Sequence, residues 1–297
     1  MNVQLVLTGL LGFFWGGFAT PLSIKLAYSF DIMDLPGPRK VHTGRTPRGA
    51  GLVLWSGYLL WSLYFVSAIP AVRCTAMGAT LIFFCGYMDD MRSLSPFLRL
   101  AVHASAAAFA AAPLDLPPLS RAVCFAWITG MTSAYNLIDG VNGLCASLFI
   151  VSAGALCFLG ASAFGAAGAG MALGVFCWNF PSARTFLGDG GSTLLGFLFA
   201  SHFAISARGV LAAVSPHETV LLLLLLGGVP ALDTLFAFSR RIVAGKSPFY
   251  PDRGHLHHIV LDRTGSPFWA VTALASLHAL FLAGGAAVFG KLCEIAR

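Results

Sequence analysis

Long uncharged stretches constrain the fold of this chain more than any other feature of its sequence. Residues 140–183 carry no charged side chain and are too long for one membrane-crossing helix of about 20 residues. Charged residues make up only 10% of the 297 residues and hydrophobic residues 57%, whereas a soluble domain has roughly 25% charged residues. We therefore expect an all-α, polytopic membrane helical bundle in which residues 1–297 form a single integral-membrane domain.

Charges, prolines and small residues divide the chain into about ten predicted transmembrane helices. These are 3–24, 49–69, 71–88, 96–112, 120–134, two spans within 140–183 separated at 160–170, 191–207, 219–238 and 267–290. Thirteen of the 18 Lys and Arg residues then fall in or beside one set of loops, which the positive-inside rule makes cytoplasmic, so both termini are predicted outside. This topology depends on two crossings within 140–183, because a single crossing would move the later loops to the opposite face.

Two adjacent carboxylates, Asp89 and Asp90, stand at the end of the third apolar run. Carboxylates against a membrane segment are costly and are functional-site hypotheses by default. The alternative is a pair that only marks the wet end of a helix, and position alone does not separate the two interpretations. Other polar clusters on the same predicted face favour a site.

The first of these clusters is basic and rich in glycine and proline. Arg39, Lys40 and His42 lie within the segment 34–51. Cations and backbone N–H groups that converge in this way suit a phosphate-rich ligand. Taken alone, the more frequent interpretation is a basic loop attracted to anionic lipid headgroups.

A second cluster repeats polar residues every three positions. Asn136, Asp139 and Asn142 have this spacing, and a helical turn would place them on one face. Gly140 and Gly143 allow a chain break or a close backbone approach there. A carboxylate flanked by two amides can bind a base or hydroxyl groups; the alternative is a plain turn between two spans.

A third cluster places Asp189 between glycines, directly before Ser192 opens the next predicted helix. Mg²⁺ prefers oxygen ligands and is often held by one or two carboxylates together with substrate phosphates. Asp189 is therefore a candidate metal ligand. A helix N-cap formed by Asp189 or Ser192 is the competing interpretation.

The fourth cluster is rich in histidine. Arg253, His255, His257 and His258 lie in the segment 247–258, where arginine and imidazolium donors can bind phosphates. A zinc site is disfavoured because no Cys or Glu follows at the usual spacing, and a solvated histidine-rich loop ranks below the phosphate interpretation. Asp233 lies inside an apolar run, where pairing of helices is at least as good an explanation as catalysis.

The order of these motifs from Asp34 to His258 resembles the polyprenyl-phosphate N-acetylhexosamine-1-phosphate transferase superfamily, glycosyltransferase family 4. The resemblance is to the GlcNAc-1-phosphate branch more than to the peptidoglycan translocase. It implies a helical bundle of ten or eleven spans with an active-site cleft on the cytoplasmic face. It also implies Mg²⁺, or Mn²⁺ in its place, on Asp189, and an acidic pair near the lipid phosphate.

The resemblance implies roles for the remaining motif residues as well. The residues with implied catalytic roles are Asp89, Asp90, Asp139, His255, His257 and His258, and those with implied substrate-binding roles are Arg39, Lys40, His42, Asn136, Asn142 and Arg253. One departure is Asn142, where the bacterial pattern usually has Asp. An amide still forms hydrogen bonds but carries no negative charge, so it is a poorer metal ligand.

The expected enzyme transfers N-acetylhexosamine 1-phosphate from a UDP-sugar, in first place UDP-GlcNAc, to undecaprenyl phosphate. It would release UMP and start a lipid-linked cell-envelope glycan in the bacterial inner membrane. Its expected partners are the UDP-sugar, the polyprenyl phosphate and the bilayer, with no nucleic acid. The rival hypothesis is a proton- or cation-coupled secondary transporter, but the sequence has no internal repeat and its polar residues do not gather at the midplane. A non-catalytic membrane scaffold is a third hypothesis.

Overall fold

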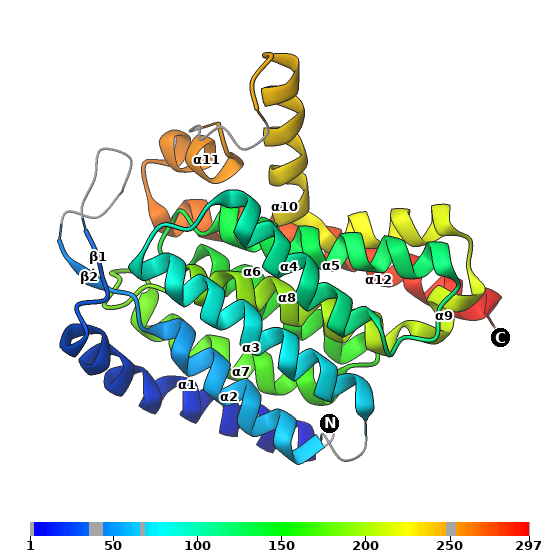
Figure 1. Ribbon diagram of the computed structural model, residues 1–297, viewed down its shortest axis with the longest axis horizontal. Coiled ribbons are helices and arrows are strands. Elements are labelled where there is room, and N and C mark those ends of the chain that lie inside the picture. The colour runs from blue at the N-terminus through cyan, green and yellow to red at the C-terminus, as the bar shows by residue number, and fades with distance from the viewer. Residues whose placement is uncertain (1–2, 36–43, 66–68, 248–253, 297) are drawn as a thin grey trace.

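The computed structural model describes residues 3–35, 44–65, 69–247 and 254–296, and this part of the chain is nearly all helical (Figure 1). The helices are α1 (Val3–Ser29), α2 (Ala50–Phe65), α3 (Pro70–Met91), α4 (Pro96–Ala111), α5 (Pro118–Ile138), α6 (Leu144–Phe158), α7 (Ser162–Asn179), α8 (Gly188–Ser206), α9 (Arg208–Ala213), α10 (Pro216–Val243), α11 (Leu256–Thr264) and α12 (Pro267–Ile295). Two short strands, β1 (Met33–Asp34) and β2 (Thr46–Pro47), pair antiparallel. The predicted all-α class is confirmed.

Each predicted span coincides with a helix, and the uncharged stretch 140–183 is divided as expected. Helix α6 ends at Phe158 and α7 begins at Ser162, with Gly160 between them at a φ of 94°. Four helices, α1, α3, α10 and α12, are long and apolar enough to cross a membrane, and α2, α4 and α6 are shorter apolar helices. The chain is thus a membrane protein by its helices, and the crossing of all ten stays a prediction.

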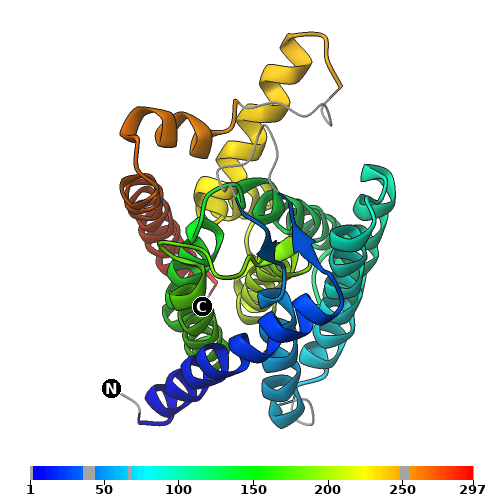
Figure 2. The same ribbon diagram turned by 90° about the vertical axis from the view of Figure 1, so that its left-hand side faces the viewer.

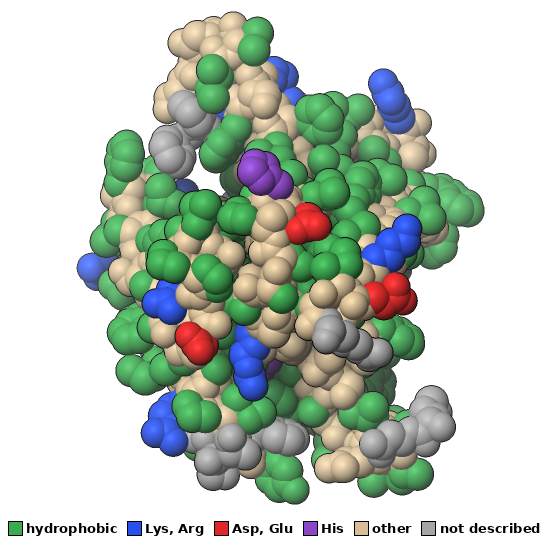
Figure 3. Space-filling model, turned by 90° about the vertical axis from the view of Figure 1, so that its right-hand side faces the viewer, with side chains coloured by type: hydrophobic (Ala, Val, Ile, Leu, Met, Phe, Trp, Pro, Cys, Tyr) green, Lys and Arg blue, Asp and Glu red, His purple; other side chains and the backbone are tan. Residues whose placement is uncertain are grey.

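Apolar side chains on the outer helices face outward, as lipid contact requires. Leu11 and Phe18 of α1 are 72% and 77% exposed, and Leu280 of α12 is 70% exposed. Figure 3 shows one end of the bundle, where hydrophobic side chains cover much of the surface and charged ones stand singly. Exposed apolar surface on this scale is typical of a membrane-facing protein.

Helix α8 is the central element of the bundle and is buried along almost its whole length. It packs against α2, α3, α5 and α6. Glycines permit the closest approaches: a Cβ on Gly51 would lie 2.7 Å from the backbone nitrogen of Gly191, and one on Gly86 would collide with the backbone of Gly190. The ends of α2 and α3 are therefore held directly against the first turn of α8.

Helix α10 is kinked in its middle, and its second half leaves the direction of the bundle (Figure 1). Gly228 has a φ of 52°, and Pro230 follows. The backbone N–H of Val229, freed from the helical ladder by the kink, donates to His278 Nδ1 on α12 at 3.3 Å. Figures 1 and 2 show that this second half of α10 projects from the bundle on the same side as helix α11, and Figure 1 shows the β1–β2 hairpin at the end of the bundle where α11 lies. The histidine motif begins α11, whereas Asp89 and Asp90 lie at the end of α3 and Asp189 in the first turn of α8.

Candidate active site

Asp90 joins the end of α3 to the beginning of α8. Its Oδ1 accepts a hydrogen bond from the backbone N–H of Asp189 at 3.0 Å, and its Oδ2 accepts one from Gly190 at 3.4 Å. An anion at the positive end of a helix is stabilised by the free N–H groups and by the helix dipole. The side chain of Asp90 is only 2% exposed, so this carboxylate acts as a buried cap for α8.

Arg48 forms the second half of this arrangement. Its guanidinium donates to Asp90 Oδ1 at 2.8 Å and also to Asp34 Oδ1 on β1. Burial lowers the pKa of Arg48, but the carboxylates of Asp90 and Asp34 outweigh that effect and raise it. Strand β2 ends at Pro47, directly before Arg48, and is held by the backbone N–H of Phe186, which donates to Pro47 O at 2.8 Å. The hairpin therefore holds the guanidinium of Arg48 in a fixed position against Asp90.

Arg99, in the first turn of α4, bridges the other two carboxylates. Its Nη1 lies 2.7 Å from Asp89 Oδ2 and 3.4 Å from Asp189 Oδ2. Asp89 also accepts the backbone N–H of Leu94 at 2.6 Å. The side chain of Asp189 is 32% exposed and that of Asp89 only 7%. Among these acids, Asp189 has the carboxylate that an outside ligand can reach.

The structure thus brings together Asp89, Asp90 and Asp189, as expected from the shared face. The competing interpretation of the Asp189 segment as its own N-cap is wrong, because Asp90 supplies the capping oxygens. Ser192 Oγ instead donates to Gly188 O at 3.1 Å and to Asn136 Oδ1 at 3.0 Å.

The prediction that Asn136, Asp139 and Asn142 share one helical face is wrong. Helix α5 ends at Ile138, so only Asn136 lies on it, and 139–143 form a turn. Asn142 donates to Pro181 O at 3.3 Å, away from the Ser192 contact of Asn136. The backbone follows the plain-turn alternative, and the left-handed Gly143, at a φ of 76°, enters α6.

The turn after α5 nevertheless contacts both halves of the site. Burial and the charge of Asp90 raise the pKa of Asp139 to about 7. Gly140 packs so closely on His257 that a Cβ at this position would collide with the ring at Nε2. The predicted close backbone approach at Gly140 is confirmed, and the atom it meets belongs to the histidine cluster.

The histidine cluster is buried and lies at the start of a helix. His255 is the N-cap residue of α11, and His257 and His258 follow in its first turn. His255 and His257 are 6% and 2% exposed, and the rings of His257 and His258 are 4.2 Å apart between centroids. The alternative of a solvated histidine-rich loop is therefore wrong for His255 and His257.

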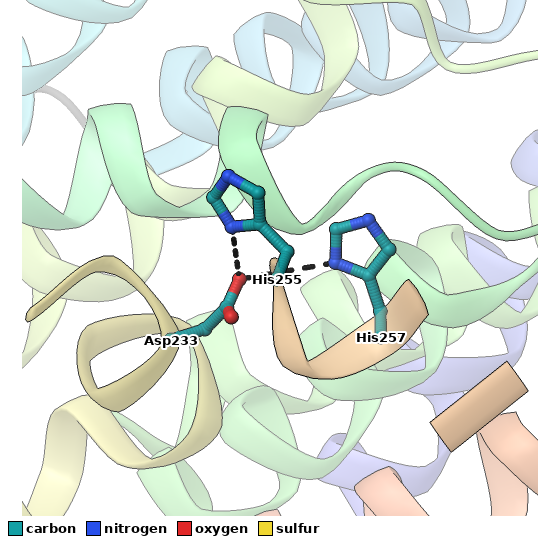
Figure 4. Close-up of side chains that lie close together, drawn as sticks. All are labelled: Asp233, His255 and His257. Atoms are coloured by element: carbon teal, nitrogen blue, oxygen red, sulfur yellow. Dashed lines mark hydrogen bonds and ion pairs between the residues drawn. The ribbon is translucent and has the colours of Figure 1, made fainter. Parts of the chain in front are cut away.

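Asp233 of α10 is the partner that the sequence motif lacked (Figure 4). Its Oδ2 lies 2.8 Å from His255 Nδ1 and 3.8 Å from His257 Nδ1, and its Oδ1 accepts the N–H of Leu256 at 2.6 Å. Arg241 Nη2 lies 3.1 Å from His255 Nε2. By distance alone, Asp233 and the two histidines could also hold a metal ion.

Some predicted residues cannot be placed, and some site residues escaped prediction. Four lie outside the described residues: Arg39, Lys40, His42 and Arg253. The sequence identifies Arg48 only as one cation of the basic segment 34–51 and Arg99 only as a cation beside a loop, and it does not assign Asp233 to the site. The signals for them were an arginine in the segment 34–51, an arginine opening α4, and a lone acid in an apolar run.

The apolar helical bundle is that of a membrane protein. Its acids, arginines and histidines form a polar site that suits charged substrates. Residues 72–207 match the model of the family described as Glycosyl transferase family 4. The chain is 32% identical to the decaprenyl-phosphate N-acetylglucosaminephosphotransferase of Mycolicibacterium smegmatis, over 87% of this chain and 76% of that protein. The chain therefore belongs to this glycosyl transferase family, which confirms the resemblance.

Two further relatives carry related names. The probable undecaprenyl-phosphate N-acetylglucosaminyl 1-phosphate transferase of Bacillus subtilis is 28% identical, over 80% of this chain and 72% of its own length. The undecaprenyl-phosphate alpha-N-acetylglucosaminyl 1-phosphate transferase of Thermotoga maritima is 27% identical, over 84% of this chain and 79% of its own length. The family match spans nearly all of α3 to α8, with the acidic residues Asp89, Asp90 and Asp189.

Proposed function

We propose that this chain transfers N-acetylglucosamine 1-phosphate from UDP-GlcNAc to undecaprenyl phosphate and releases UMP. The reaction would start a lipid-linked cell-envelope glycan at the cytoplasmic face of a bacterial inner membrane. One observation carries the proposal: Asp89, Asp90 and Asp189 converge with Arg48 and Arg99 in a family whose named relatives are such transferases. No relative cited above is named as a transporter, so that alternative gains no support.

The arrangement suits phosphoryl transfer, which depends mostly on positioning and on neutralising charge. Arg48 and Arg99 provide two fixed cations, and both are partly exposed at 24% and 31%. Because Asp90 and Asp89 hold them in place, their remaining N–H groups can bind phosphate oxygens without reorganisation. In this proposal the acidic pair orients the arginines beside the lipid phosphate and the sugar diphosphate.

The donor set fits a divalent cation at Asp189. Its carboxylate is the accessible one of the three, and Asp89 lies beside it across Arg99. Hard oxygen ligands of this kind are those that Mg²⁺ uses when substrate phosphates complete its coordination. Bound Mg²⁺ would supply neutralisation of the diphosphate charge as UMP leaves. Mn²⁺ has the same ligand preference and would serve in its place.

Asp139 is suited to hold a proton during the reaction. Its pKa of about 7 allows both protonation states at neutral pH, which is the optimum for a general acid or base. The side chains of Asp89 and Asp90 are only 7% and 2% exposed, and each is bound to an arginine, so neither carboxylate faces a ligand. We therefore assign proton uptake from the acceptor phosphate to Asp139 rather than to the acidic pair.

The test is release of UMP by the purified protein in detergent or nanodiscs with UDP-GlcNAc, undecaprenyl phosphate and Mg²⁺. We expect release that requires the lipid phosphate and stops with EDTA. Asp189→Ala and Asp90→Asn should abolish it while the protein still folds in membranes. The matched control is Thr234→Val, which removes a buried hydroxyl on α10 that has no hydrogen-bond partner in the described structure.

A panel of UDP-sugars would define the donor. UDP-GlcNAc is expected to be the best substrate, with UDP-GalNAc and UDP-QuiNAc as comparisons. Absence of UMP with every donor, although the lipid phosphate is present, would refute the proposed reaction. Near-normal turnover by either acidic variant would refute the assignment of the site.

A further inference from the structure

Asp233 is a buried acid to which the proposed reaction assigns no role. It is 1% exposed and lies just beyond the kink of α10, where Pro230 and Gly228 redirect the helix. Both of its oxygens face the start of α11: Oδ1 accepts the Leu256 N–H and Oδ2 contacts His255 Nδ1. A buried carboxylate is costly unless its partners satisfy it. Both oxygens of Asp233 therefore bind the segment that carries the histidines.

Arg241 settles which nitrogen of His255 carries the proton. A guanidinium has only N–H donors, so at 3.1 Å from Nε2 it requires that nitrogen to accept. In a neutral ring the proton is then on Nδ1, which donates to Asp233 Oδ2 at 2.8 Å. His255 is thus fixed as the Nδ1–H tautomer between the carboxylate of Asp233 and the guanidinium of Arg241.

The same contact argues against a metal ion in this cluster. A metal on His255 Nδ1 would leave the proton on Nε2, where it would face the N–H donor of Arg241. Metal-bound histidines donate their second N–H to an acceptor such as a carboxylate or a carbonyl. The hydrogen-bond pattern is therefore that of an orienting acid.

His257 completes the arrangement. Its Nδ1 is buried without a hydrogen-bond partner in the described structure and lies 3.8 Å from the carboxylate oxygen Oδ2 of Asp233. A carboxylate on that side favours the proton on Nδ1. The opposite nitrogen, Nε2, is pressed against Gly140, next to Asp139. In the Nδ1–H tautomer, Nε2 presents a lone pair to the turn that holds Asp139.

We propose that Asp233 is a positioning residue that, together with Arg241 at His255, holds His255 and His257 as Nδ1–H tautomers and so keeps His257 Nε2 unprotonated toward the 139–140 turn. The consequence for turnover rests on the proposed function, whereas the tautomer does not. When a buried acid orients a histidine, replacing the acid by its amide keeps the shape of the site but removes the preference for the Nδ1–H tautomer.

The experiment is nitrogen NMR of ¹⁵N-histidine-labelled protein in nanodiscs. Signals are assigned by their loss in His255→Gln and His257→Gln. The wild type should show Nδ1–H for both rings. Asp233→Asn should shift His257 toward Nε2–H or a mixture, because Asp233 is the charge beside its Nδ1, whereas Arg241 still favours the Nδ1–H form of His255. In the UMP assay Asp233→Asn should lower kcat by about 10²- to 10⁴-fold, with a much smaller change in KM for UDP-GlcNAc.

Asp233→Asn itself separates this role from simple helix capping. Its amide oxygen can still accept the Leu256 N–H at the Oδ1 position, so the cap at the start of α11 is kept while the negative charge beside the histidines is lost. A capping role alone would leave the turnover and both tautomers of Asp233→Asn close to those of the wild type. We expect Thr234→Val, at the neighbouring position of α10, to keep both tautomers and most of the turnover.

Two results would overturn the proposal. One is an Nε2–H form of either ring in the wild type, which can be read even if Asp233→Asn does not fold. The other is retention of both Nδ1–H forms in Asp233→Asn. Failure of the wild type to release UMP would instead count against the proposed function and leave the tautomer measurement valid.

Discussion

Asp90→Asn gives the most direct test of how the acidic centre is built. The amide has the same shape, so its oxygen at the Oδ1 position can still accept from the Asp189 N–H and from Arg48. Two things are lost: the negative charge facing Arg48, and the acceptor for Gly190 N–H, which would meet an NH₂ group instead. A hydrogen bond to a charged group contributes about 1.5–3 kcal/mol, and breaking a fully buried pair costs about 3–5 kcal/mol.

The expected loss of unfolding free energy is about 2 kcal/mol, because Arg48 keeps its contact with Asp34 and is not left uncompensated. The assay is denaturant titration in mixed micelles. The matched control is Asp31→Asn, which removes the exposed pair with Arg45. Asp31 has a φ of 54°, a conformation that asparagine tolerates, so the control should cost less than about 1 kcal/mol. Equal effects of the two variants would refute the buried-cap reasoning.

Three further predictions follow from the same geometry. Since Asp139 must be unprotonated to accept a proton, UMP release should rise with pH through about 7, and Asp139→Asn should remove that limb of the pH–rate profile. Asp189→Asn should abolish Mg²⁺-dependent turnover without lowering stability in the denaturant titration, because its carboxylate faces outward near two other acids. Gly86→Ala should cost about 1–3 kcal/mol of unfolding free energy by forcing α3 from the Gly190 backbone, whereas Gly130→Ala, with open space around it, should be neutral or slightly stabilising.

The positions of the helices were predictable because the apolar runs are long and end at prolines or small residues, as at Pro70, Pro96 and Gly160. The partners of the polar residues were not. Nothing in the segment 34–51 says that Arg48 reaches Asp90, because that contact depends on the β1–β2 hairpin and on the backbone of Phe186. Such contacts are set by tertiary packing, which local sequence patterns do not encode.

Two misinterpretations have distinct physical causes. The three-residue period of 136–142 predicts a helix, but the chain leaves the helix at Ile138 and Gly143 then adopts a left-handed conformation. Asp233 was visible as a lone acid in an apolar run, yet its partner His255 lies 22 residues away, beyond the bend of α10. In both cases the backbone departs from helical geometry near a glycine, Gly143 or Gly228, and this changes the direction of the side chains that follow. Periodicity in the sequence does not predict such departures.

The last turn of α5 and the turn that follows it contact both halves of the site. Asn136 accepts from Ser192 in the half built around α8, and Gly140 packs on His257 in the half carried by α10 and α11. Asp139 lies between these two contacts, with its pKa raised by burial and by Asp90. Because the kink at Gly228 directs the second half of α10 toward α11, Asp233 can hold the histidines against this turn. One acid with a pKa near neutral thus stands where the arginine–carboxylate centre and the oriented histidines meet, which is where a proton would have to move if phosphoryl transfer takes place here.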